Sequence, residues 1–354
     1  MKKIVSLLVA AAMCMGLCGI LGSCNNQNVI YVYNWGQYLS RGEEEGEMDI
    51  LAEFEAETGI KVVYRTFDHN EGMYAQLKAG ASKYDLVIPS DYMIAKMIEE
   101  DMLEKIDYEN IPNYKNIMED FKGLEYDPTG EYSVPYTWGT VGLIYNTKMV
   151  TEPVDSWEML WNEKYDGKIL MFNNPRDAFG IAEKKLGYSQ NTSDETELRA
   201  CAEELKKQAP LTQYVMDEIF DKMINGDAAI APYYAGDYLT MKDENPDLAF
   251  VIPKEGTNRF VDAMCIPKGA QNKAGAEAFI NFLLDPEIGL ANTEYLGYST
   301  PNQAVYELLD DEVKNDGVSY PSQEILEKCE SFVNLPSDAN ALMQDLWIEV
   351  KGNK

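Results

Sequence analysis

Five short segments of the sequence place aromatic rings next to acidic or polar side chains. They are Trp35-Gly36-Gln37-Tyr38, Ser90-Asp91-Tyr92, Pro232-Tyr233-Tyr234, Phe260-Val261-Asp262 and Tyr295 to Tyr298. An aromatic face attracts a cation and a carboxylate neutralises it, so this combination suits the binding of positively charged groups. Each segment alone is more often core packing or turn chemistry. Five together, most of them at the ends of expected strands, favour a ligand site.

A flexible polyamine is the ligand chemistry that such segments would suit. It carries protonated amines along an alkyl chain, so its receptor needs flat apolar walls for the methylenes and carboxylates for the nitrogens. Inside a closing cleft an unpaired buried charge costs several kcal/mol, so neutral and anionic solutes would be rejected.

The residues that most catalytic sites need are scarce. His69 is the only histidine, which leaves little prospect of a His-based triad or a His-rich metal site, and we expect it at the surface. No Gly-rich phosphate loop, His-Glu-x-x-His, Gly-x-Ser-x-Gly or EF-hand calcium loop occurs. With 60 acids, a carboxylate pair for glycoside hydrolysis can always be drawn, so its availability carries little information. We therefore expect no catalytic residue, no metal site and no cofactor.

Length and charge narrow the class of protein. A chain of 354 residues is longer than a usual single domain and predicts two domains. Acids outnumber bases by 60 to 30, which gives a formal net charge of -30. Such a surface repels nucleic acid and anionic membranes and attracts cations. We therefore expect no nucleic-acid partner, and a monomer.

The N-terminus reads as a secretion signal. Lys2 and Lys3 precede an apolar run over residues 4–21, and the polar residues 25–28 follow. The end of the run, Leu21-Gly22-Ser23-Cys24, resembles the lipobox of bacterial lipoproteins. The resemblance implies that residues 1–23 are removed and that Cys24 carries the lipid anchor. A retained transmembrane helix is the weaker interpretation, because the run is short and contains glycine.

Three cysteines remain in the mature chain once Cys24 is lipidated, namely Cys201, Cys265 and Cys329. An odd count argues against a disulfide framework. Cys265, between Met264 and Ile266, reads as a small core residue.

Apolar runs of strand type alternate with helical patterns along the chain, which is typical of an α/β fold with a largely parallel sheet. We expect strands near residues 29–33, 60–67, 84–89, 168–172, 228–232, 248–252 and 261–267, an extended pair at 132–136 and 142–146, and helices near 48–57, 71–79, 178–186, 195–207 and 274–284. No long linker appears, so strands that cross between two lobes must join them.

At these residues the sequence closely resembles the spermidine/putrescine-binding proteins of polyamine ABC transporters, over nearly the whole mature chain. The landmarks are Tyr33-Asn34-Trp35 with Tyr38, Glu57-Thr58-Gly59-Ile60-Lys61-Val62, Asn70-Glu71 with Met73-Tyr74-Ala75, Tyr84-Asp85-Leu86-Val87 with Pro89-Ser90, Pro135-Tyr136 with Trp138-Gly139, Asn281-Phe282-Leu283-Leu284, and Gly297-Tyr298 with Thr300-Pro301-Asn302. Several are short and shared with other binding proteins, but their order and spacing are specific.

The resemblance implies an α/β, two-lobed fold like that of periplasmic binding proteins, with crossover hinge strands and hinge closure on the ligand. Lobe 1 would comprise residues 28–139 and 262–306, and lobe 2 residues 140–261 and 307–354. It also implies a ligand site made of Trp35, Tyr38, Ser90, Tyr92, Asn174, Asp177, Tyr234, Phe260, Asp262 and Tyr298.

The sequence departs from the family pattern inside this site. Asn174 removes one carboxylate of an acid pair, so only Asp177 keeps its charge there. Gly36 replaces a residue that is often larger and polar, and a C-terminal glutamine has no clear counterpart near Phe332 and Val333. Asp177 and Asp262 would anchor both ends of a diamine or two of three amines, which leaves putrescine and spermidine open.

The expected function is capture of a polyamine without chemistry and its delivery to a membrane permease. The protein would act outside the cytoplasmic membrane, anchored there as a lipoprotein, and in the periplasm if the cell has an outer membrane. A receptor for ferric ion, a sugar or an anion is an alternative, although arginine is scarce around the aromatic segments. A secreted hydrolase that uses two carboxylates is a second alternative from a different class.

Overall fold

The computed structural model describes residues 28–43, 46–80 and 83–352. The predicted signal segment and Cys24 lie outside the described residues. In the described part of the chain no helix is long and apolar enough to cross a membrane.

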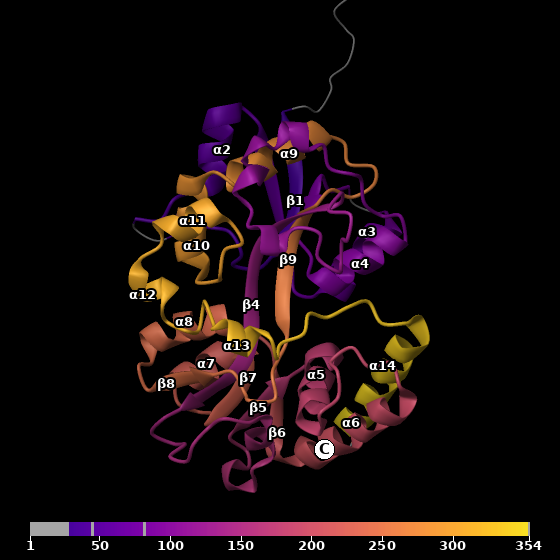
Figure 1. The fold of residues 1–354 in the computed structure, drawn as a ribbon, viewed down its shortest axis with the longest axis vertical. Helices are drawn as coiled ribbons and strands as arrows, with labels where there is room; N and C mark the ends of the chain where they lie inside the picture. The colour runs from indigo at the N-terminus through magenta and orange to yellow at the C-terminus, as the bar shows by residue number, and fades with distance from the viewer. Residues whose placement is uncertain (1–27, 44–45, 81–82, 353–354) are drawn as a thin grey trace, which may run out of the picture.

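Nine strands of the described residues form one sheet that runs through the whole molecule (Figure 1). The order is β2-β1-β3-β9-β4-β7-β5-β6, with β8 paired to β4. The strands are β1 (Val29–Trp35), β2 (Lys61–Phe67), β3 (Leu86–Val87), β4 (Ser133–Asn146), β5 (Ile169–Phe172), β6 (Thr212–Val215), β7 (Ile230–Tyr234), β8 (Leu248–Val251) and β9 (Arg259–Cys265). Pairs at both ends of the sheet are parallel, whereas every pair that includes β4 or β9 is antiparallel.

Strand β4 joins the two halves of the molecule. Its first part, up to Thr140, pairs with β9, and from Val141 onward it pairs with β7 and β8. Figure 1 shows β4 and β9 running from the upper group of elements into the lower one. The crossover strands predicted from the sequence are therefore present, and the change of partner at Thr140–Val141 marks the natural place for a hinge.

Helices cover the sheet in both halves. Beside β1 lie α2 (Ile50–Thr58), α3 (Asn70–Ala79), α4 (Asp91–Glu99), α9 (Lys273–Leu283), α10 (Pro286–Leu296), α11 (Gln303–Leu308) and α12 (Asp311–Lys314). Beside β5 lie α5 (Pro175–Leu186), α6 (Glu195–Gln208), α7 (Ile219–Ile224), α8 (Ala235–Glu244) and α14 (Ser337–Gly352), while α13 (Gln323–Leu326) lies near the middle (Figure 1).

Two hydrophobic cores correspond to the two halves. One surrounds β1 and contains Phe54, Met73 and Phe279, and we call this half the β1 lobe. The other surrounds β5 and contains Trp157 and Phe179, and we call it the β5 lobe. The protein is thus a two-lobed α/β structure, as the sequence predicts.

Local signals explain where the helices begin and end. The Asp49 side chain accepts hydrogen bonds from the backbone N–H groups of Leu51 and Ala52 and so caps α2, which ends at Gly59 with φ +71°. In α5 the same roles fall to the Asn174 side chain, with Pro175 in the first turn, and to Gly187. Cys201, Cys265 and Cys329 are free thiols.

Gly142 on β4 is required by close packing. A methyl group there would lie 2.3 Å from the Phe250 ring and 2.7 Å from the Val251 carbonyl oxygen, and that backbone is fixed by strand pairing. We predict that Gly142→Ala lowers the free energy of unfolding by about 1–3 kcal/mol in denaturant titrations. The control is Gly352→Ala, where nothing lies within 4 Å. Equal stability of the two variants would contradict the packing argument.

Candidate functional site

Most of the predicted site residues lie between the two lobes, where each contacts the next in a chain of side-chain contacts. The first of these contacts are made by aromatic rings. The Tyr234 hydroxyl donates to Asp177 Oδ2 at 3.0 Å, and the Tyr234 ring meets the Phe260 ring with centroids 5.5 Å apart. Phe260 in turn contacts Tyr298 at 5.9 Å, and Tyr298 contacts Tyr38 at 5.5 Å. The rings therefore form one continuous wall from the β5 lobe to the β1 lobe.

The next contacts in this chain are hydrogen bonds between polar groups. The Tyr38 hydroxyl donates to Asp262 Oδ2 at 2.7 Å, and the backbone of Asp262 forms a bridge with Ser90. The Asn70 amide donates to Ser90 Oγ at 3.1 Å and to the Tyr92 hydroxyl at 3.2 Å.

Phe332 and Arg176 connect the end of this chain of contacts back to its start. The Tyr92 ring lies 6.4 Å from the Phe332 ring, and the Arg176 guanidinium stacks 4.3 Å from the centre of Phe332. Arg176 is the chain neighbour of Asp177, where the sequence of contacts began. We call this closed set of contacts the contact ring, and it brings residues from nearly 300 positions of chain around one location.

Trp35 is the last residue of β1, and the ring that it packs on is not a member of the contact ring. Its ring packs on Phe67 with centroids 4.6 Å apart. Among the described residues its indole Nε1 is buried and has no hydrogen-bond partner. A buried donor without a partner is costly, so this N–H is available to an acceptor or to an ordered water.

Asp262 is the most enclosed acid of the contact ring, with 5% of the residue exposed. Burial raises the pKa of its carboxyl to about 6, although the polar side chains of Ser90 and Tyr38 act in the opposite direction. Its second oxygen, Oδ1, is buried and has no hydrogen-bond partner among the described residues. The carboxylate therefore has an unsatisfied acceptor inside the site.

Asn174 and Asp177 act as a unit at the start of α5. Asn174 Oδ1 accepts from the Asp177 N–H at 2.9 Å, and Asn174 Nδ2 donates to Asp177 Oδ2 at 2.7 Å. Burial raises the pKa of the Asp177 carboxyl, and the hydrogen bonds from Asn174 and Tyr234 oppose the shift. Asn174 is thus placed to orient Asp177.

Sequence reasoning missed Asp237, in the first turn of α8. Burial raises the pKa of the Asp237 carboxyl to about 7, and a hydrogen bond from Tyr298 opposes this shift. Tyr298 reaches it because Gly236 has no side chain: a Cβ there would lie 2.6 Å from the Tyr298 ring. The spacing of three residues between Tyr234 and Asp237 at a helix start was the signal that could have identified it.

Arg176 and Phe332 were also missed as members of the site. Arg176 is 8% exposed, and its second terminal nitrogen donates to Asn191 Oδ1 at 2.8 Å and to the Val333 carbonyl at 3.3 Å. Phe332 is 4% exposed. No local pattern distinguishes Phe332, because only the path of the chain after α13 brings it to the site.

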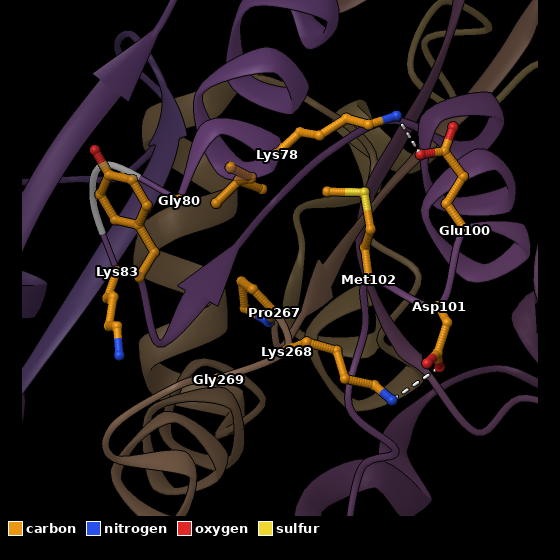
Figure 2. A pocket seen from close by; sticks show the side chains of 11 residues that line it. Lys78, Gly80, Lys83, Glu100, Asp101, Met102, Pro267, Lys268 and Gly269 are labelled. Carbon is orange, nitrogen blue, oxygen red and sulfur yellow. Dashed lines mark hydrogen bonds and ion pairs between the residues drawn. The ribbon is translucent and has the colours of Figure 1, made fainter.

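A separate surface cavity of about 410 Å³ lies on the β1 lobe, lined by Leu77, Lys78, Gly80, Lys83, Tyr84, Glu100, Asp101, Met102, Pro267, Lys268 and Gly269. Figure 2 shows two of its lysines in ion pairs, Lys78 with Glu100 and Lys268 with Asp101, each at 2.8 Å. None of the predicted site residues lines this cavity.

Comparison with known proteins shows which family the chain resembles. The model of the bacterial extracellular solute-binding protein family matches residues 49–318. A spermidine/putrescine-binding periplasmic protein of Salmonella typhimurium is 36% identical over 353 residues, which is 98% of each chain.

Two solved structures are similar over most of the chain. One, from Listeria monocytogenes, is described as a candidate spermidine/putrescine ABC transporter; it is 38% identical, covers 92% of this chain and 100% of its own, and has a TM-score of 0.87. The other is a lipoprotein of Treponema pallidum at 30% identity, with coverage of 92% and 99% and a TM-score of 0.82.

Asp262 should reduce the stability of the ligand-free protein. Its pKa of about 6 in the folded state exceeds the ordinary value of 3.8, so the folded state loses relative stability as the pH rises from about 4 to about 6 and keeps that loss above it. We predict that Asp262→Asn raises the free energy of unfolding by about 1–3 kcal/mol at pH 7.5.

The gain should shrink toward pH 4, where Asp262 is protonated in the folded state and increasingly so in the unfolded state. Denaturant titrations at pH 7.5 and pH 4 measure both values. A variant that is less stable than the parent protein at pH 7.5 would contradict the assignment of an unsatisfied buried carboxylate.

Proposed function

Since this chain belongs to the bacterial extracellular solute-binding protein family, we propose that it is the substrate-binding component of an ABC importer that captures spermidine, putrescine or both. The family consists of substrate-binding transporter components, so the protein is not an enzyme. The relative from Salmonella typhimurium, similar over 98% of the chain, is named for these two polyamines.

The observation that carries the proposal is the buried Asp262 carboxylate with an oxygen that lacks a partner inside the aromatic contact ring. A protonated amine would supply that partner and remove the cost of the buried charge. The ring faces of Tyr38, Phe260 and Tyr298 would then enclose the adjoining methylene groups.

The remaining site residues take the roles that their positions suggest. Asp177, oriented by Asn174, would neutralise a second amine, and Tyr234 beside it would wall the chain. Asp237 adds a third carboxyl near Tyr298. On the other lobe Ser90 and Tyr92 are joined through Asn70, and Trp35 would add a ring face from the end of β1.

Closure on the ligand follows from the two lobes and the strands that join them. A polyamine that contacts both lobes stabilises the closed form, because only a ligand with higher affinity for that form shifts the equilibrium. The closed protein would present both lobes to the membrane permease. The lobe boundaries given above remain a prediction.

Cys24 is proposed as the lipid anchor at the outer face of the cytoplasmic membrane, with the protein acting as a monomer. The lipobox-like Leu21-Gly22-Ser23-Cys24 and the similar lipoprotein of Treponema pallidum support the anchor.

The alternatives from the sequence are not favoured. A ferric-ion, sugar or anion receptor and a carboxylate-based glycoside hydrolase both conflict with the polyamine names of relatives that match the whole chain.

Calorimetric titration tests the proposal directly. We predict that the chain from Asn25 onward, which retains every described element, binds at least one of putrescine, cadaverine, spermidine and spermine and does not bind sugars. Asp262→Asn and Asp177→Asn should weaken binding well over tenfold, since a buried charge that loses its partner costs about 3–5 kcal/mol. The matched control is Asp243→Asn on the exposed face of α8. Unchanged affinity in Asp262→Asn would overturn the assigned anchor.

The affinity should depend on pH. A bound cation needs ionised carboxylates, and the raised pKa values of Asp262, about 6, and Asp237, about 7, mean that these groups take up protons as the pH falls through that range. We predict that affinity falls between pH 8 and pH 5 and that binding releases protons near pH 6, measured by titration in buffers of different ionisation enthalpy. Constant affinity over this range would show that these carboxyls do not face the ligand.

A further inference from the structure

The chain crosses between the lobes a third time after α13. Figure 1 shows this part of the chain passing from the middle of the molecule toward α14. Tyr320 and Leu326, before the crossing, pack on the core of the β1 lobe, whereas Leu335 and the helix α14 pack on the core of the β5 lobe. We call residues 328–334 the crossing segment.

The crossing segment is attached to the hinge by backbone pairing. The Glu330 N–H donates to the Thr257 carbonyl and the Arg259 N–H donates to the Glu330 carbonyl, both at 3.0 Å. The Ser331 hydroxyl donates to the Arg259 carbonyl at 2.8 Å. The segment therefore lies alongside the chain that enters β9.

Side chains of the β5 lobe fix the crossing segment further. Asn191 donates to the Ser331 carbonyl at 2.8 Å and accepts from the Val333 N–H at 2.9 Å. Lys184 forms an ion pair with Glu330. These bonds make the segment part of the β5 lobe, so that it moves with that lobe when the hinge opens.

Two side chains of the crossing segment nevertheless contact the β1 lobe. Phe332 meets the Tyr92 ring, and Asn334 Nδ2 donates to Glu99 Oε2 at 2.8 Å. Tyr92 and Glu99 are both on α4, whose buried residues Met93, Ile94 and Met97 belong to the β1 core. Glu99 lies at the opposite end of α4 from Asp91, whose carboxylate accepts a hydrogen bond from the β9 backbone at Val261. Opening of the lobes would therefore separate Asn334 from Glu99.

We propose that Phe332 and Asn334 form a latch against α4 that keeps the lobes closed and so sets how long a ligand remains bound. The proposal rests on the proposed function only for its ligand. A contact made in the closed form alone slows opening and dissociation, whereas it leaves the encounter of ligand with the open form unchanged.

Glu99 and Asn334 are the positions to test, because Phe332 is part of the contact ring and its replacement would also change the ligand wall. Glu99→Ala and Asn334→Ala should each raise the polyamine dissociation rate by roughly three- to tenfold without lowering the association rate, measured by stopped flow. The exchanged pair, Glu99→Gln with Asn334→Glu, restores an amide–carboxylate bond with the roles reversed and should return the rate toward that of the parent protein.

A matched control is Gln303→Ala, which removes an amide–carboxylate hydrogen bond of 3.0 Å between Gln303 and Glu307, both in α11. It should leave both rates unchanged. Dissociation rates that stay at the parental value in Glu99→Ala and Asn334→Ala, or a rise that the exchanged pair fails to reverse, would overturn the latch.

Small-angle scattering of the ligand-free proteins separates failure of the latch from failure of the proposed function. If no polyamine binds the parent protein, the proposed function fails and scattering becomes the deciding measurement for the latch. A larger radius of gyration in Glu99→Ala and Asn334→Ala than in the parent and Gln303→Ala supports the latch, and equal radii overturn it.

Discussion

The site depends on a carboxylate that is buried before its partner arrives. Asp262 is 5% exposed and has one oxygen bonded to Tyr38 and the other without a partner among the described residues. Burial raises the pKa of this carboxyl to about 6, because the charged form is less stable in the buried site than in water. A cation of suitable shape stabilises the charged form, so binding relieves a cost that burial already imposes on the empty site.

The sheet explains how such a site can both form and open. Strand β4 belongs to both lobes, because it exchanges β9 for β7 and β8 at Thr140–Val141. Asp262 lies on β9 beside this junction, whereas Asp177 and Asp237 start helices of the β5 lobe. Rotation at the junction therefore changes the distance from Asp262 to the other two carboxyls without disrupting either core, which is how a hinge between rigid lobes works.

The charged side chains of the contact ring occupy separate positions around it. The acids of the contact ring are separated by aromatic rings, and the cation within the ring, Arg176, is stacked on Phe332 and bonded to Asn191 and Val333. Burial raises the pKa of Asp91, next to the site, to about 8, so it is largely neutral near pH 7. The field that a ligand meets thus comes from a few ionised groups and only in part from the net charge of -30.

Local chemistry determined much of this protein from sequence alone: the α/β class, the helix expected near residues 48–57, and the aromatic and acidic segments proposed to supply the walls. These signals act over a few residues, so they can be read without the fold. Residues 132–136 and 142–146, expected as an extended pair, form the single strand β4, because that choice depends on distant partners. Asp237, Arg176 and Phe332 join the site only through tertiary structure, since contacts such as Tyr38 with Asp262 span 224 positions of the chain.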